Sequence, residues 1–135
     1  MLIVHAYIEV TDLARGIEFY CAGLGLVHKR HLGPRWVELQ GANLPIFLLA
    51  DRPAVAELGT TKAQRDFGRH WTPVHLDFIV TDLDGTVARL CDLGASLDRE
   101  IQIREYGRIA NMGDPFGNGF DLIEFSGPGY DNLQR

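Results

Sequence analysis

The sequence predicts an α+β fold made of two tandem β-α-β-β-β modules. Residues 5–13 are His-Ala-Tyr-Ile-Glu-Val-Thr-Asp-Leu, and residues 75–83 are His-Leu-Asp-Phe-Ile-Val-Thr-Asp-Leu. The histidine and the Val-Thr-Asp-Leu run match at a constant shift of 70 residues, which also places Cys21 on Cys91. Such internal repetition indicates two copies of one structural unit. We expect a single domain, 1–135, with repeats at 1–50 and 73–126.

Length and composition agree with one small globular domain. A chain of 135 residues with 46% hydrophobic content can bury a core without disulfide support. The net charge of −5 argues against nucleic-acid binding. No stretch approaches the roughly 20 consecutive apolar residues of a membrane span. We therefore expect a cytoplasmic protein that binds neither nucleic acid nor a membrane.

Each copy opens with a strand that leads directly into a helix. Alternate residues are apolar over Leu2–Val10 and over Val74–Val80, which is the period of a half-buried strand. Both strands stop at Thr-Asp, whose side chains favour helix N-caps. Apolar residues then follow at helical spacing, at Leu13, Ile17, Tyr20 and Leu24 in the first copy and at Leu83, Val87, Leu90 and Leu93 in the second. Gly25 and Gly94 suit the helix C-caps.

Three shorter strands are expected after each helix. They are Val27–His31, Arg35–Gln40 and Pro45–Ala50 in the first copy, and Leu97–Ile103, Arg108–Met112 and Gly119–Phe125 in the second. The run Asp-Pro-Phe-Gly-Asn-Gly at 114–119 predicts a hairpin turn, because proline presets its backbone and glycine and asparagine accept positive φ. Segment 51–72 has no counterpart in the second copy and shows a weak helical pattern. It is expected to be a linker or insertion, and it could serve as a lid.

His5 and His75 lie on the strand faces that point away from the predicted helices. If the two copies pack about a pseudo-two-fold axis, these histidines reach equivalent places around one cavity. Asp121 faces the same cavity if Phe120 and Leu122 pack on the helices. Two imidazoles and one carboxylate on one side of a divalent ion leave open positions for a substrate, which suits iron(II) or manganese. The alternative is that each histidine is a partly exposed strand residue hydrogen-bonded to a neighbour.

Other residues on these faces are candidates for substrate contacts or proton transfer. Glu38 could act as a general base, with a surface carboxylate on an edge strand as the alternative. Tyr7, Glu9 and Asp77 share the histidine faces and could hydrogen-bond a substrate, and either carboxylate could also supply the base. Trp36 could provide an apolar wall.

Three further charged residues are weaker candidates for the site. Glu124 could replace Asp121 as a ligand, but strand alternation places it on the opposite face. Arg104 and Arg108 could bind an anionic group, against the commoner role of solvated strand arginines. The sequence also contains no phosphate-binding loop, nucleophile elbow or CxxC pair, which argues against a nucleotide cofactor and a serine triad.

These motifs resemble those of the vicinal oxygen chelate (VOC) superfamily, which includes glyoxalase I, extradiol dioxygenases, fosfomycin-resistance thiol transferases and bleomycin-resistance proteins. The resemblance rests on the two repeated openings and on the turn at 114–119. It implies a glyoxalase-like fold in which paired β-α-β-β-β modules form a cup-shaped mixed sheet, usually within a homodimer. His5 and His75 match the family's two histidine ligand positions, and Asp121 matches the position of its metal-binding glutamate.

The sequence departs from the family pattern at two positions. Aspartate at 121 is one methylene shorter than the usual glutamate, and Pro45–Leu49 lacks the first-copy glutamate that glyoxalase I would need. The second difference favours the three-ligand pattern of extradiol dioxygenases and fosfomycin-resistance enzymes. The resemblance thus implies a metal-dependent enzyme acting on a small molecule with vicinal oxygens, through lyase or isomerase chemistry, dioxygenation or antibiotic modification. Iron, manganese, nickel and zinc are the candidate ions.

A second function from a different class is also consistent with the sequence. Bleomycin-resistance proteins bind a small compound in the dimer cleft without a metal. In such a protein the aromatic residues would form the binding surface, and the candidates are Tyr7, Trp36, Phe47 and Trp71. Ligand binding that does not depend on a metal would distinguish this protein class from the enzyme.

Overall fold

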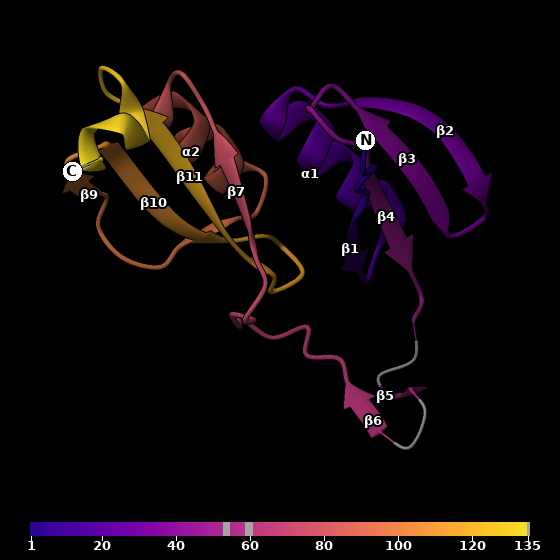
Figure 1. Cartoon of the computed structure of the whole chain (residues 1–135). Helices are drawn as coiled ribbons and strands as arrows, with labels where there is room; N and C mark the ends of the chain where they lie inside the picture. Colours follow the sequence, from indigo (N-terminus) through magenta and orange to yellow (C-terminus); the bar gives the residue numbers. More distant parts are fainter. Residues whose placement is uncertain (53–54, 59–60, 135) are drawn as a thin grey trace. The chain divides into compact units, whose positions relative to one another are not determined.

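The chain folds into two compact units, Met1–Phe67 and Gly68–Arg135, and each contains one of the predicted copies. The structure is a computed structural model and describes residues 1–52, 55–58 and 61–134 (Figure 1). Residues 53–54 and 59–60 of the predicted linker lie outside the described residues. Each unit combines one α-helix with one main sheet, which confirms the predicted α+β fold.

The first unit follows the predicted β-α-β-β-β order. Its elements are β1 (Ala6–Val10), α1 (Leu13–Leu24), β2 (Val27–Gly33), β3 (Trp36–Gln40) and β4 (Ile46–Ala50). The sheet order is β1-β4-β3-β2, with β1 parallel to β4 and the other pairs antiparallel. The first strand starts at Ala6 instead of Leu2, because its partner β4 begins only at Ile46, opposite Ala6.

Helix α1 begins and ends as predicted, but its buried face shares only Tyr20 with the predicted apolar stripe. Asp12 caps its N-terminus by accepting a hydrogen bond from the Arg15 backbone at 3.1 Å, and Gly25 caps its C-terminus with φ of 74°. The buried residues are Gly16, Phe19, Tyr20 and Gly23, whereas Leu13, Ile17 and Leu24 are only half-buried. A Cβ on Gly16 would lie 3.2 Å from Leu48 Cδ1, so the glycine allows the helix to approach the sheet closely.

Two paired strands follow the first sheet where the sequence shows a weak helical pattern. Strands β5 (Val55–Leu58) and β6 (Thr61–Gln64) pair antiparallel with each other. The helical interpretation of this segment was therefore wrong. Val55 and Thr61 are β-branched, and such residues favour extended backbone over helix.

The second unit repeats the order of the first with two modifications. Its elements are β7 (Leu76–Ile79), α2 (Leu83–Asp92), β8 (Ser96–Leu97), β9 (Gln102–Arg104), β10 (Gly107–Gly113), β11 (Gly119–Phe125) and a 3-10 helix at Gly129–Leu133. The expected strand Leu97–Ile103 is split into β8 and β9, which pair separately with β10. Between them Asp98 accepts hydrogen bonds from Arg69 and Trp71.

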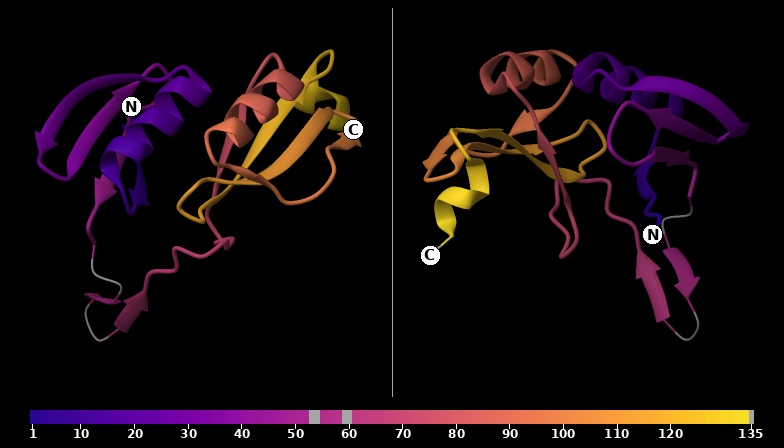
Figure 2. Two further views of the ribbon diagram at one scale, coloured as in Figure 1. Left: turned by 180° about the vertical axis from the view of Figure 1, so that it is seen from behind. Right: turned by 45° about the horizontal axis from the view of Figure 1, so that its top comes forward.

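Within the described residues of the second unit, α2 covers one face of the sheet, and the other face, here called the open face, carries only the short C-terminal 3-10 helix (Figure 2). Its order is β7-β11-β10-β8, with β9 also beside β10, and β7 runs parallel to β11. Figure 2 shows α2 on one face and the C-terminal 3-10 helix on the other. The covered face packs Leu83, Leu90 and Leu122, all fully buried. Within the described part of the chain, no helix has the length and apolar character to cross a membrane.

Candidate metal centre

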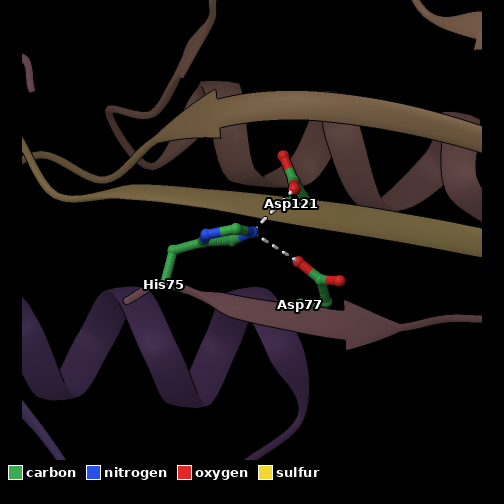
Figure 3. A group of neighbouring side chains, drawn as sticks. All are labelled: His75, Asp77 and Asp121. Atoms are coloured by element: carbon green, nitrogen blue, oxygen red, sulfur yellow. Dashed lines mark ion pairs between the residues drawn. The ribbon is translucent and has the colours of Figure 1, made fainter. Parts of the chain in front are cut away.

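Three polar side chains converge on the open face of the second sheet. Asp77 lies on β7 and Asp121 on β11, and the two residues are direct partners in this parallel pair. His75 precedes Asp77 by two residues and therefore projects from the same face. Figure 3 shows the imidazole reaching toward both carboxylates.

The separations between these side chains fit a divalent cation. His75 Nε2 lies 3.2 Å from Asp77 Oδ1 and 3.3 Å from Asp121 Oδ2. Metal–ligand bonds of about 2.1 Å at tetrahedral or octahedral angles place neighbouring ligand atoms about 3.0–3.4 Å apart. One imidazole nitrogen and two carboxylate oxygens are donors that manganese, iron and zinc accept. The three residues form a candidate metal site, with all their ligand atoms within 4.8 Å of one another.

The two neighbouring carboxylates, Asp77 and Asp121, favour a positive charge between them. Burial raises the pKa of Asp77, the adjoining Asp121 raises it further by charge and hydrogen bonding, and His75 opposes the shift. Two carboxylates this close are stabilised by a shared proton, an imidazolium or a metal ion. The arrangement therefore favours occupancy by a positively charged group.

A hydrogen-bonded tether fixes the orientation of Asp121. Asn111 on β10 is its antiparallel partner and donates from Nδ2 to Asp121 Oδ1 at 2.6 Å. The other amide atom, Asn111 Oδ1, accepts a hydrogen bond from Arg99 Nε at 2.6 Å. The tether leaves Asp121 Oδ2, the oxygen nearer His75, as the available ligand atom.

A cavity adjoins these side chains within the second unit. Its volume is about 370 Å³, and it is lined by Trp71, His75, Asp98, Arg99, Asn111 and Asp121. Trp71 meets the His75 ring edge-on at 5.6 Å, and its indole nitrogen donates to Asp98 at 2.9 Å. This volume is in the range of small-molecule sites.

The first unit gathers three of the four predicted aromatic residues on one face of its sheet, whereas the fourth, Trp71, lies in the second unit. Strand register places Tyr7 beside Phe47, and their rings stack at 4.8 Å. His5 contacts the same ring at 4.9 Å, and Trp36 lies 6.4 Å from it. Phe47 is buried beneath these side chains, while Tyr7 and Trp36 are partly exposed. The result is an aromatic surface suited to stacking.

Glu38 lies on that face and forms ion pairs with two cations. Arg30 Nε contacts it at 2.6 Å and Lys29 Nζ at 3.4 Å. Burial acts to raise the pKa of Glu38, but the hydrogen bonds and charges of Arg30 and Lys29 together hold it below its usual value. A carboxylate stabilised in this way is a weak base, so general-base catalysis by Glu38 stays a prediction that its environment disfavours.

Glu9 anchors a later segment of the first unit. Arg65 binds its carboxylate in a bidentate manner at 2.9 and 3.0 Å, and Arg52 Nε lies 3.4 Å away. The hydrogen bond from Arg65 lowers the pKa of Glu9, burial opposes this shift, and the charges of both arginines add to it. A substrate contact or proton transfer by Glu9 would have to compete with these ion pairs.

The Glu9 ion pairs predict a pH-dependent contribution to stability. Because the folded-state pKa is lowered, the contribution is present above the ordinary value of 4.5 and is lost as pH falls through the folded-state value. Glu9→Gln should therefore be less stable than wild type at pH 7, with a difference that shrinks below pH 4.5. Urea unfolding at several pH values, with the exposed Glu18→Gln as control, measures this. A difference independent of pH would contradict the assignment.

The structure brings three of the predicted site residues together in the second unit. His75, Asp77 and Asp121 form one cluster, in which Asp77 was expected as a substrate contact or base and not as a ligand. The units are described separately, so ligation of the same ion by His5 stays a prediction. Asn111 and Arg99 carried no recognisable sequence signal, because their contacts join residues that are distant in the sequence.

Two other charged residues support the N-terminus of α2. Glu124 accepts a hydrogen bond from the Leu83 backbone at 2.8 Å, on the face opposite Asp121, as strand alternation predicts. Arg108 bonds to both Glu124 and Asp84. Its guanidinium is therefore engaged by two carboxylates on the helix side of the sheet, so anion binding by Arg108 stays a prediction that these ion pairs disfavour.

The two-module fold and the cluster on the open sheet face define a glyoxalase-like protein. A family model described as a glyoxalase-like domain matches residues 5–123, so the chain belongs to this family within the VOC superfamily. The chain is 36% identical over 118 residues to the anthracycline biosynthesis protein DnrV of Streptomyces peucetius. This alignment covers 85% of the chain and 38% of DnrV, so the chain spans well under half of that relative.

Solved structures share the fold at low sequence identity. A variant of the fosfomycin resistance protein FosX from Listeria monocytogenes, complexed with Mn(II) and 1S,2S-dihydroxypropylphosphonic acid, superposes with a TM-score of 0.72 and 19% identity. That comparison covers 100% of this chain and 98% of FosX. The antibiotic binding protein TnmS3 from Streptomyces sp. CB03234 gives a TM-score of 0.63 and 22% identity over 93% of this chain and 97% of TnmS3. The two proteins have different stated functions on one fold.

Proposed function

We propose that the chain is a metal-dependent VOC enzyme that acts on a small molecule with vicinal oxygens. The observation that carries this proposal is the cluster of His75, Asp77 and Asp121 beside a cavity of about 370 Å³. The Mn(II) complex of FosX and the biosynthetic name of DnrV support it as properties of relatives. The reaction type, whether lyase, isomerase, dioxygenase or transferase, is left to experiment.

Different residues of the chain would bind the ion, contact the substrate and orient the ligands at this site. His75, Asp77 and Asp121 would hold the ion, with His5 as a further ligand from the first unit. The ion would act as a Lewis acid that stabilises an enolate or oxyanion. Trp71 would form one wall of the cavity and restrict the orientation of a bound ring. Asn111 would keep Asp121 oriented through the hydrogen bond at 2.6 Å.

The alternative function is metal-free binding of an aromatic compound. The observation that favours it is the surface formed by His5, Tyr7, Trp36 and Phe47, which offers stacking contacts without needing an ion. The name of TnmS3 shows that an antibiotic binding protein exists on this fold. This function would place ligand affinity in the aromatic residues and not in the carboxylates.

A pair of planar probes separates the two functions. The enzyme should bind 1,2-dihydroxyanthraquinone, which carries vicinal oxygens, at least about tenfold more tightly than 2-hydroxyanthraquinone. Tryptophan fluorescence titration of protein loaded with one equivalent of Mn(II) would measure this preference, and chelator treatment should remove it. Equal binding of both probes, unchanged by chelator, would contradict the enzyme and support the metal-free binding protein.

A histidine variant tests the contribution of the first unit to the metal site. His5→Ala should weaken Mn(II) binding by at least about tenfold, because it removes one imidazole ligand. The matched control is His28→Ala, since His28 is an exposed residue of β2 whose ring meets that of His31 edge-on. Isothermal titration calorimetry gives both affinities. Equal affinity of His5→Ala and wild type would limit the metal site to the second unit.

A further inference from the structure

The cavity beside the candidate metal site contains a cation that the proposed function does not use. Arg99 lines this cavity together with Trp71 and Asp121. It is exposed and lies between the short strands β8 and β9. Of the residues that line the cavity, Arg99 is the one arginine or lysine. A permanent positive charge at this place affects which ligands can bind.

The guanidinium of Arg99 is held at one end and available at the other. Arg99 Nε donates to Asn111 Oδ1 at 2.6 Å. Within the described residues, no hydrogen bond or ion pair engages its two terminal amino groups. An arginine fixed through Nε loses little further freedom when its terminal groups bind a ligand.

Two carboxylates, Asp98 and Glu100, adjoin Arg99 in the sequence, and within the described residues neither forms an ion pair with it. Asp98 accepts a hydrogen bond from Arg69 Nε at 2.9 Å and another from Trp71 Nε1 at 2.9 Å. Arg69 also donates to the backbone carbonyls of Met112 and Gly117, which fixes this pair against the sheet. Asp98 is therefore satisfied, and the charge of Arg99 is left for a ligand.

The tether also sets the position of Arg99 relative to the candidate metal site. Asn111 contacts Arg99 through its oxygen and Asp121 through its nitrogen, so one amide joins the two side chains. Trp71 lines the same cavity and contacts His75 edge-on. A ligand in this cavity would meet an aromatic wall, the carboxylate cluster and a guanidinium at once.

We propose that Arg99 is a specificity residue that selects ligands carrying a negatively charged oxygen, such as a carboxylate or an ionised phenol, on a planar aromatic ring. This inference rests on the proposed function, because it names the class of substrate for the same cavity. Arg99 binds the anionic oxygen through its terminal amino groups, and Trp71 contacts the ring. Because Asn111 holds the guanidinium through Nε, Arg99 fixes the position of this oxygen in the cavity.

Two probes of the same shape test the proposed selectivity. Anthraquinone-2-sulfonate carries a negative charge but is a weak metal ligand, and anthraquinone-2-sulfonamide is its neutral counterpart. Calorimetric titration of Mn(II)-loaded wild type should show at least about tenfold tighter binding of the sulfonate. Arg99→Gln should lose that preference, while Arg104→Gln, on β9 outside the lining of this cavity, should retain it.

The outcomes separate this inference from the proposed function. Mn(II) affinity, measured in the same variants, should change by less than about tenfold in Arg99→Gln, because Asn111 keeps its own hydrogen bond to Asp121. If wild type binds the two probes equally or binds neither, or if Arg99→Gln keeps the preference, the anion-selecting role is overturned. If Mn(II) still binds when the role of Arg99 is overturned, the proposed function is not contradicted. Failure of wild type to bind Mn(II) would contradict the proposed function, while a charge preference lost in Arg99→Gln would still support the role of Arg99.

Discussion

Asp121→Ala is expected to lower the affinity of the protein for Mn(II) by at least about 100-fold. The substitution removes one of the three ligands and leaves Asn111 without its carboxylate partner. Calorimetric titration of the apo-protein measures the effect. Asp121→Glu should retain binding, because the longer carboxylate can still reach the ion. Affinity in Asp121→Ala equal to that of wild type would exclude Asp121 as a ligand.

Two controls make the loss of binding specific. Glu124→Gln changes a carboxylate on the same strand but on the opposite face, so Mn(II) affinity should stay within about twofold of wild type. Asp121→Ala itself should fold, because burial is the main cause that raises the pKa of Asp77, and the substitution removes the further contribution of the Asp121 charge. A melting temperature at or above that of the wild-type apo-protein would show that lost binding is not caused by unfolding.

Asp114→Ala is expected to destabilise the second unit by about 3–4 kcal/mol. Asp114 is buried, and its Oδ1 accepts hydrogen bonds from the backbones of Phe116 at 2.8 Å and Asn118 at 2.9 Å. Its Oδ2 accepts a third bond, from the Asn118 side chain at 3.0 Å. Alanine would leave both backbone donors without this partner inside the turn that joins β10 to β11.

Urea unfolding measures the loss at Asp114. Asp114→Asn should fall between wild type and alanine, because it keeps one acceptor oxygen but loses the charge. Asp92→Ala removes an exposed carboxylate at the end of α2 and should change the free energy of unfolding by less than about 0.5 kcal/mol. A loss below about 1 kcal/mol in Asp114→Ala would show that the turn is held mainly by its glycines and proline.

Much of the fold could be predicted because the sequence repeats its own start signals. The Thr-Asp caps and the alternating strands place α1 and the strand Gly119–Phe125 at their observed bounds. The spacing of apolar residues did not identify the whole buried face of α1. Gly16 lies on that face because it lets the helix approach the sheet closely, and a glycine adds nothing to a hydrophobic pattern. Strands β5 and β6 were not predicted, because they pair only with each other and their residues do not show a clear alternation of apolar and polar side chains.

Only part of the candidate site could be predicted from the sequence. Alternation on β11 correctly separated Asp121 from Glu124, since a strand has a period of two. Assigning Asp77 as a ligand required the parallel register that sets it opposite Asp121, and one sequence does not specify that register. Arg104 and Arg108 were considered for anion binding, whereas Arg99 is the arginine that lines the cavity.

The most direct test of the metal assignment is the metal content of wild-type protein purified without a metal-affinity tag. Elemental analysis would be combined with anaerobic titration of the apo-protein with iron(II), manganese, nickel and zinc. We expect one equivalent of a divalent ion per chain, lost in Asp121→Ala. No binding of any of these ions above background would contradict the metal-dependent enzyme and leave the aromatic surface around Phe47 as the functional part of the chain.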